Sequence, residues 1–272
     1  MPELAVNGTR LWYELSGEGP PLVQIGGAVS GHEGYAAVTA QMAEHFTVRD
    51  YDHRGYGGSE RPDQRYDIDV WADDLAAVLA GLGIERLHVH GGSMGGFIAA
   101  RFAARYPERV DRLVIGGAVA RCDRMGRTQF EVWKLLARAY GVESEAVALE
   151  LTTKAFSRGY LDTLGDDLVR EMQEVTARNV TTPVFCDACD AMIDTDVVPE
   201  LHRITAPTLV MAGGEDCLTP VDAGPDGAGA RAMAEGIPDA QLLVLEGCGH
   251  GNLVERPEES IAAIVAFLQE GR

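Results

Sequence analysis

The chain is poor in the features that would indicate a membrane, secreted or nucleic-acid-binding protein. No apolar run approaches the roughly 20 residues that a membrane-spanning helix needs. The first residues, MPELAVNGTRLWYEL, lack the basic stretch and apolar core of a secretory signal. Positive charge is scarce, because 23 lysines and arginines face 42 aspartates and glutamates, for a net charge of −19. Such a surface repels phosphate backbones and anionic lipids, so we expect neither nucleic acid nor a membrane as a partner.

Cysteine is also sparse, with an odd count of five in 272 residues. A chain of this length buries a core large enough to fold without disulfides, so we expect reduced thiols and a cytoplasmic location. Cys186 and Cys189 have the spacing of a redox or metal pair, but no second pair or histidine cluster accompanies them. Their segment has helical spacing, and we expect them to be structural.

Short apolar runs alternate with helical periodicity along most of the chain. Asn7-Gly8 predicts a hairpin turn between two short strands within residues 4–15. Further strands are expected at residues 22–25, 46–50, 87–89, 110–115, 208–211 and 241–247. Helices are expected directly after residue 93 and at residues 35–45, 66–82, 129–140, 144–156, 166–179, 184–193, 228–236 and 257–268.

This order of elements predicts an α/β fold, a mostly parallel eight-stranded sheet flanked by helices. No strand pattern is found between about residues 121 and 205, where only helical segments occur. We therefore expect a core domain made of residues 1–120 and 206–272, with a helical block at 121–205 inserted between two of its strands.

The sequence LHVHGGSMGG at Leu87–Gly96 is the strongest chemical signal in the chain. A buried strand runs into Gly91-x-Ser93-x-Gly95, and a helical segment follows, which is the pattern of a nucleophile elbow. So sharp a reversal strains the central residue and leaves no room for side chains two positions before and after it. The pattern predicts Ser93 as a nucleophile at the end of the sheet.

A serine hydroxyl needs a base, and the base needs a carboxylate to orient it. Because loops at the carboxyl ends of parallel strands meet in one crevice, we looked directly after the strands. His250 stands in a glycine-rich loop after the last strand, and Asp216 follows the strand before it. The chain order Ser, acid, His favours Asp216, while Asp123, after an earlier strand, stays an alternative acid.

Two backbone N–H groups are candidates to stabilise an oxyanion. The first is that of Met94, directly after the proposed nucleophile. The second is that of Gly27, in the Gly26-Gly27-Ala28 loop after the strand at 22–25, where a glycine lets the backbone approach a ligand closely.

At this point the chain resembles the α/β-hydrolase superfamily over almost its whole length. The residues that carry the resemblance are the Gly27 loop, Asp52-x-Arg54-Gly55-x-Gly57-x-Ser59, the elbow, Gly213-x-x-Asp216-x-x-x-Pro220 and Gly249-His250. The helical block looks like the family's cap, which roofs the active site. Many relatives carry His-Gly where this chain has Ile25-Gly26, so the outer support of the Gly27 amide differs here.

The resemblance implies a serine hydrolase that cleaves a carboxylic ester or lactone without metal or organic cofactor. The elbow is similar to that of enol-lactone hydrolases and small carboxylesterases, and some lactone hydrolases of the family take their acid from the Asp123 position. Relatives that cleave carbon–halogen bonds or epoxides use aspartate where Ser93 stands. Carbon–carbon hydrolases often have asparagine in place of Gly92, which lowers that alternative without removing it. A ligand receptor on the same fold is a third reading.

The expected partner is an apolar, medium-sized small molecule. Candidate pocket walls in the helical block are Met125, Phe130, Trp133, Phe156, Phe185 and Met192, each of which could equally pack the block's helices together. The oligomeric state, a homo-oligomer included, and a gating role for the loop at 221–230 are left open by the sequence.

Overall fold

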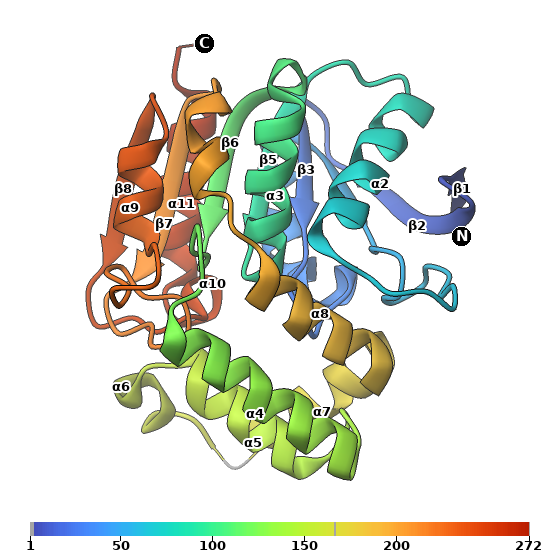
Figure 1. Ribbon diagram of the computed structural model, residues 1–272. Coiled ribbons are helices and arrows are strands. Elements are labelled where there is room, and N and C mark those ends of the chain that lie inside the picture. The colour runs from blue at the N-terminus through green and yellow to red at the C-terminus, as the bar shows by residue number, and fades with distance from the viewer. Residues whose placement is uncertain (1–2, 166, 272) are drawn as a thin grey trace.

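One eight-stranded sheet forms the centre of the computed structural model, which describes residues 3–165 and 167–271 (Figure 1). Its strands lie in the order β1-β2-β4-β3-β5-β6-β7-β8. They are β1 (Glu3–Val6), β2 (Thr9–Ser16), β3 (Pro21–Ile25), β4 (Thr47–Tyr51), β5 (Leu87–Gly92), β6 (Val110–Gly116), β7 (Thr208–Gly213) and β8 (Ala240–Leu245). Only the pairs β1–β2 and β2–β4 are antiparallel among these strands. The mostly parallel sheet expected from the sequence is confirmed.

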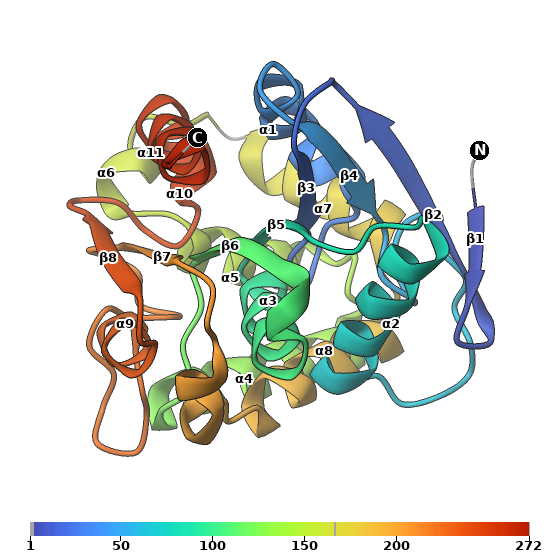
Figure 2. The same ribbon diagram turned by 90° about the horizontal axis from the view of Figure 1, so that it is seen from above.

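The sheet is covered on both faces, which explains its apolar strands. Every residue of β5 and β7 is buried. Seen from above, α1 (Ala36–Met42) and α11 (Pro257–Gln269) lie on one face, while α2 (Ile68–Gly81), α3 (Met94–Arg105) and α9 (Ala230–Gly236) lie on the other (Figure 2). A strand buried on both sides has no polar face, so its sequence reads as a continuous apolar run.

The chain between β6 and β7 is helical, as expected, and lies across one end of the sheet (Figure 1). Its helices are α4 (Arg124–Tyr140), α5 (Glu145–Ala155), α6 (Arg158–Leu161), α7 (Asp167–Asn179) and α8 (Thr182–Asp194). The expected helix at 166–179 begins on a residue outside those described, and the part that is described starts at Asp167. No helix in the described part of the chain is long and apolar enough to cross a membrane.

Several element boundaries differ from the sequence expectations for local reasons. Helix α4 starts at Arg124, several residues before the expected 129, because the Asp123 side chain accepts a hydrogen bond from the Gly126 N–H and caps the helix. The two four-residue helices, α6 and α10 (Asn252–Glu255), were not expected, since so short a segment shows no periodicity. The described part of the chain also contains three short 3₁₀ segments, at His32–Tyr35, Pro107–Arg109 and Val198–Arg203.

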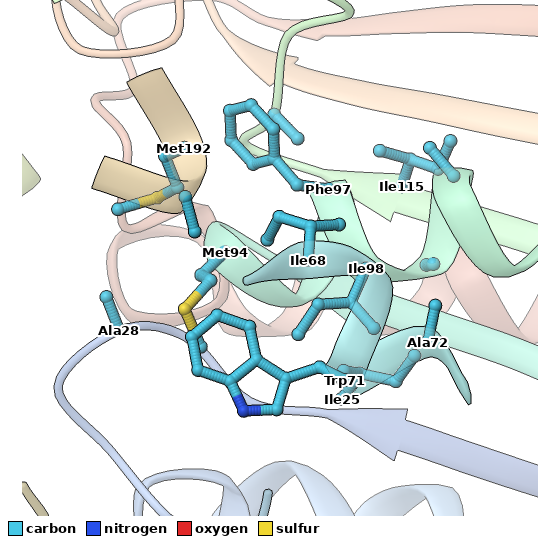
Figure 3. Close-up of a cluster of buried hydrophobic side chains, with 14 of the residues drawn as sticks. Ile25, Ala28, Ile68, Trp71, Ala72, Met94, Phe97, Ile98, Ile115 and Met192 are labelled. Carbon is cyan, nitrogen blue, oxygen red and sulfur yellow. The ribbon is translucent and has the colours of Figure 1, made fainter. Parts of the chain in front are cut away.

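A hydrophobic cluster around α3 joins the sheet layer to the helical block (Figure 3). Phe97 and Ile98 of α3 pack with Trp71 of α2, and Met192 of α8 lies beside them. Met192 is 2% exposed, so its side chain serves this shared core. The block is therefore anchored to the same core that supports the elbow, at the start of α3.

Candidate active site

The turn between β5 and α3 places one serine in a strained backbone conformation. Ser93 has φ 55° and ψ −125°, in a region that residues other than glycine rarely adopt. A Cβ on Gly91 would lie 2.1 Å from the Gly95 carbonyl oxygen, and one on Gly95 would lie 2.0 Å from that of Ile25. The two glycines thus occupy positions where no side chain fits, and the turn holds Ser93 at the carboxyl end of the sheet.

Three residues far apart in the sequence meet at this turn. His250 Nε2 lies 2.9 Å from Ser93 Oγ, and His250 Nδ1 lies 2.9 Å from Asp216 Oδ2. Because an ionised carboxylate only accepts hydrogen bonds, Nδ1 carries the proton and Nε2 is free to accept the serine hydroxyl. The arrangement is a continuous path for a proton from an alcohol to an imidazole that a carboxylate orients.

The Asp216 carboxylate is fixed by its own loop. Its Oδ1 accepts hydrogen bonds from the N–H groups of Leu218 and Thr219, at 2.8 and 2.9 Å. The Thr219 hydroxyl donates to Oδ2 at 2.6 Å and lies 3.0 Å from His250 Nδ1. The sequence analysis missed Thr219; an aspartate followed within three residues by a threonine in a turn is the signal that could have found it.

The charges of this pair stabilise each other. Burial alone would raise the pKa of Asp216, but the charge of His250 and the hydrogen bonds from His250 and Thr219 hold it below its usual value. Burial would lower the pKa of His250, and the neighbouring Asp216 outweighs this effect and raises it. Asp216 is therefore ionised at neutral pH and stabilises the protonated imidazole.

Asp123, the alternative acid, lies at another position. Its Oδ1 accepts a hydrogen bond from the Gly126 N–H at 2.9 Å, and its Oδ2 accepts one from the Gly224 N–H at 2.8 Å. The carboxylate caps α4 and holds the loop at 221–230 against the start of that helix. In the structure, the carboxylate on His250 is that of Asp216.

The two candidate oxyanion donors flank the serine. A Cβ on Gly27 would lie 3.3 Å from Ser93 Cβ and 3.7 Å from Ser93 Oγ, so the loop backbone passes next to the hydroxyl. Met94 begins α3, and the N–H groups of a first helical turn have no carbonyl partner within the helix. Its side chain points into the core towards Trp71, which leaves the backbone N–H as its polar group near Ser93 (Figure 3).

The six candidate wall residues divide by their surroundings. Phe130, Trp133 and Phe185 are buried and pack together. The Trp133 ring centroid lies 5.4 Å from that of Phe130 and 6.2 Å from that of Phe185. Met125 is 59% exposed. Phe156 lies against the His250 loop, because a Cβ on Gly251 would come within 2.7 Å of its ring. Of the six, Phe156 is the one that these contacts bring next to the catalytic candidates.

Cys186 and Cys189 are free and buried on α8. Burial raises the pKa of both thiols, which disfavours the thiolate that redox or metal chemistry needs.

Comparisons with known proteins identify the family and support the fold. The family model of the alpha/beta hydrolase fold matches residues 20–257. The chain is 29% identical to a putative carbamate hydrolase RutD from Azorhizobium caulinodans, over 99% of both chains. It is also 29% identical to a 2-hydroxymuconate semialdehyde hydrolase from Pseudomonas sp., over 98% of this chain and 93% of that one. The crystal structure of an enol-lactonase from Burkholderia xenovorans LB400 superposes with a TM-score of 0.87 at 27% identity, covering 99% of this chain and 100% of that one. The chain therefore belongs to the alpha/beta hydrolase fold family and has its sheet architecture.

Proposed function

We propose that this hydrolase cleaves a carboxylic ester or lactone through an acyl-enzyme on Ser93. The observation that carries the proposal is the hydrogen-bonded path from Ser93 Oγ through His250 to the buried Asp216, with 2.9 Å at each step. A strained serine joined to an oriented imidazole is what nucleophilic catalysis requires.

The reaction follows from the proton positions. Ser93 Oγ bonds to the substrate carbonyl carbon while its proton passes to His250 Nε2, and the carbonyl oxygen becomes an oxyanion facing the N–H groups of Gly27 and Met94. The carbon–oxygen bond to the leaving group then breaks, and His250 returns its proton to the departing alkoxide. Water, deprotonated by His250, attacks the acyl-enzyme, and collapse of the second tetrahedral intermediate releases the acid and restores Ser93.

Residues 121–205 act in this proposal as a cap over the core domain formed by residues 1–120 and 206–272. The cap lies at the end of the sheet where β5 and β7 end and are followed by Ser93 and Asp216 (Figure 1). Phe156, the candidate wall residue that lies against the His250 loop, favours an apolar, medium-sized substrate. The enol-lactonase among the neighbours supports a lactone as one substrate class.

Carbon–carbon cleavage of a ring-fission diketone is the second candidate, and the 29% identical semialdehyde hydrolase favours it. The same serine, histidine and aspartate could serve both reactions, so only substrates separate them. A panel of p-nitrophenyl esters, enol-lactones, macrolactones, carbamates and a ring-fission diketone should give the highest kcat/KM on an ester or lactone. A preference for the diketone by tenfold or more would support the second candidate instead.

The first experiment replaces the proposed nucleophile. Ser93→Ala should lower kcat on p-nitrophenyl butyrate by about 10⁴ or more, because the acyl-enzyme has no oxygen to form on. Intact-mass spectrometry of wild type quenched during turnover should show an acyl adduct that the variant lacks.

Ser16→Ala, at the end of β2, is the matched control and should keep wild-type activity. Full activity in Ser93→Ala, with its melting temperature unchanged, would falsify the proposed mechanism. A stable bound ligand without turnover would instead identify a receptor on this fold.

A further inference from the structure

The loop after β3 carries the Gly27 N–H but lacks the histidine that many relatives place at its start. Ile25 stands at that position, is fully buried and packs into the α3 core (Figure 3). An isoleucine side chain forms no hydrogen bond, so it cannot fix the polar backbone of the following residues. Another group must hold the peptide that presents the Gly27 N–H.

His53, two residues after β4, contacts that peptide. Its Nε2 lies 3.0 Å from the Gly26 carbonyl oxygen, and its side chain is almost fully buried. Because a carbonyl only accepts, Nε2 must carry a hydrogen. Burial lowers the pKa of His53, so the ring is neutral and Nδ1 is unprotonated. The contact is a hydrogen bond from a neutral imidazole N–H to the Gly26 carbonyl.

The Gly26 carbonyl and the Gly27 N–H belong to one peptide unit, and no described peptide bond is cis. In a trans peptide these two groups point in opposite directions, so a donor that fixes the oxygen also fixes the direction of the N–H. A hydrogen bond on the oxygen also polarises the peptide and makes the N–H a stronger donor.

We propose that His53 is a positioning residue for the oxyanion: its hydrogen bond to the Gly26 carbonyl aims the Gly27 N–H at the oxygen that becomes negative when Ser93 attacks. The inference rests on the proposed function and adds to it a residue of the Asp52–Ser59 segment. His53 itself does not touch the substrate.

The surroundings of His53 suit a fixed donor. Its ring contacts the rings of Tyr51, Tyr56 and Trp71, with centroids 5.2, 5.6 and 6.1 Å away. Tyr56 OH also donates to the Ala28 carbonyl at 3.2 Å, so the same segment holds two carbonyls of the loop. His53 Nδ1 has no hydrogen-bond partner within residues 3–165 and 167–271, so the ring is held by its Nε2 hydrogen bond to the loop.

The other end of the loop is tied to the same segment. The Asp52 carboxylate accepts hydrogen bonds from the N–H groups of His32 and Gly58, at 2.7 and 2.8 Å. The path from Gly26 to His32 is therefore supported at its start, its middle and its end by residues 52–58. A variant without the His53 N–H keeps the hydrogen bonds of Tyr56 and Asp52, so we expect only the peptide between Gly26 and Gly27 to change its orientation.

The test uses His53→Phe, which keeps an aromatic ring among its neighbours but has no N–H. A trifluoromethyl ketone probes the oxyanion, because Ser93 Oγ adds to its carbonyl carbon and its oxygen takes the negative charge. The matching methyl ketone reports ordinary binding. The ratio of the two inhibition constants, trifluoromethyl over methyl, should rise about tenfold in His53→Phe, and kcat should fall by a similar factor with KM nearly unchanged, since losing a whole oxyanion donor costs about 10²–10³ in kcat.

His53→Gln, whose amide carries an N–H at comparable reach, should restore both values to within about threefold of wild type. His88→Phe, a buried histidine on β5, is the control for loss of a core imidazole and should leave the ratio unchanged. If His53→Phe does not fold, His53→Leu and His53→Gln are compared in the same way.

The inference is overturned if the ratio of inhibition constants rises less than threefold in His53→Phe. It is also overturned if His53→Gln does not bring that ratio back towards the wild-type value. These outcomes are distinct from failure of the proposed function. If wild type neither hydrolyses esters nor forms a Ser93 adduct with the trifluoromethyl ketone, the proposed function is wrong, and the inference falls with it.

Discussion

Single side chains set the pH at which the proposed base works. His250 must be neutral to take the Ser93 proton, and Asp216 raises its pKa above the usual value near 6.5. The protonated fraction of His250 therefore disappears only when the pH rises above that value. Activity should accordingly be lost on acidification at a higher pH than an isolated histidine would give.

Asp216→Asn tests this electrostatic argument. In wild type the acid limb of kcat/KM on a p-nitrophenyl ester should have its midpoint above pH 6.5. In the variant the midpoint should move down, because burial then acts on His250 without a neighbouring charge, and kcat should fall by about 10⁴. Stopped assays from pH 4.5 to 9 measure both. Identical midpoints in the two proteins would contradict the role given to Asp216.

The residues that the sequence analysis identified are those with a local signature. Ser93 lies between obligatory glycines, and Asp216 and His250 lie in the loops that follow two strands. His53 has no such signature, since its hydrogen bond is to a backbone oxygen 27 residues away that only folding brings near. Thr219 has only a weak one, the three-residue spacing from Asp216 within a turn. The sequence therefore predicts a site residue only where the local backbone conformation requires a recognisable pattern around it.

At the scale of elements, the elbow depends on two glycines packed against neighbouring backbone. A methyl on Gly95 would lie 2.0 Å from the Ile25 carbonyl oxygen, and neither strand β3 nor helix α3 can move without disturbing the sheet. This contact joins the loop that carries Gly27 to the turn that carries Ser93. The glycine at position 95 is thus required by the close contact between α3 and β3.

Gly95→Ala should lower the free energy of unfolding by about 1–3 kcal/mol or more, because overpacking displaces backbone. Gly159→Ala is the matched control, since a Cβ there meets nothing within 4 Å, and its effect should stay within about 0.5 kcal/mol. Urea denaturation followed by tryptophan fluorescence measures both changes. Equal stability of the two variants would show that the elbow tolerates a side chain.

Across the whole molecule, one carboxylate joins the helical block to the His250 loop. Glu255 Oε1 accepts hydrogen bonds from the N–H groups of Ser157 and Gly249, both at 2.9 Å, and its Oε2 accepts one from the Ser157 hydroxyl at 2.6 Å. The Gly251 N–H also donates to the Ala155 carbonyl at 2.6 Å. The position of the helical block is thus coupled to the loop that carries the proposed base.

Glu255→Ala should lower kcat about tenfold, since a small misplacement of a catalytic group is costly in rate. It should also lower the free energy of unfolding by about 1.5–3 kcal/mol through the lost charge-assisted hydrogen bonds. Glu258→Ala, exposed in the first turn of α11, is the control and should change neither by much. Ester kinetics and urea denaturation are the measurements. An unchanged kcat together with reduced stability would show that the contact holds the fold without positioning His250.

The succession of strands and helices along the chain, the apolar character of the strands and the sharp turn at Ser93 were determined by the sequence alone, because periodicity and backbone sterics act over a few residues. Only the tertiary structure decided which carboxylate meets His250. Asp123 and Asp216 each lie in a loop after a strand, but the Asp123 carboxylate caps the start of α4, whereas the Asp216 carboxylate forms a hydrogen bond with the His250 imidazole. The structure also decided which groups hold Gly26 and Ser157, since hydrogen bonds between residues 27 and 98 positions apart depend on how the sheet and helices pack, which no local pattern records.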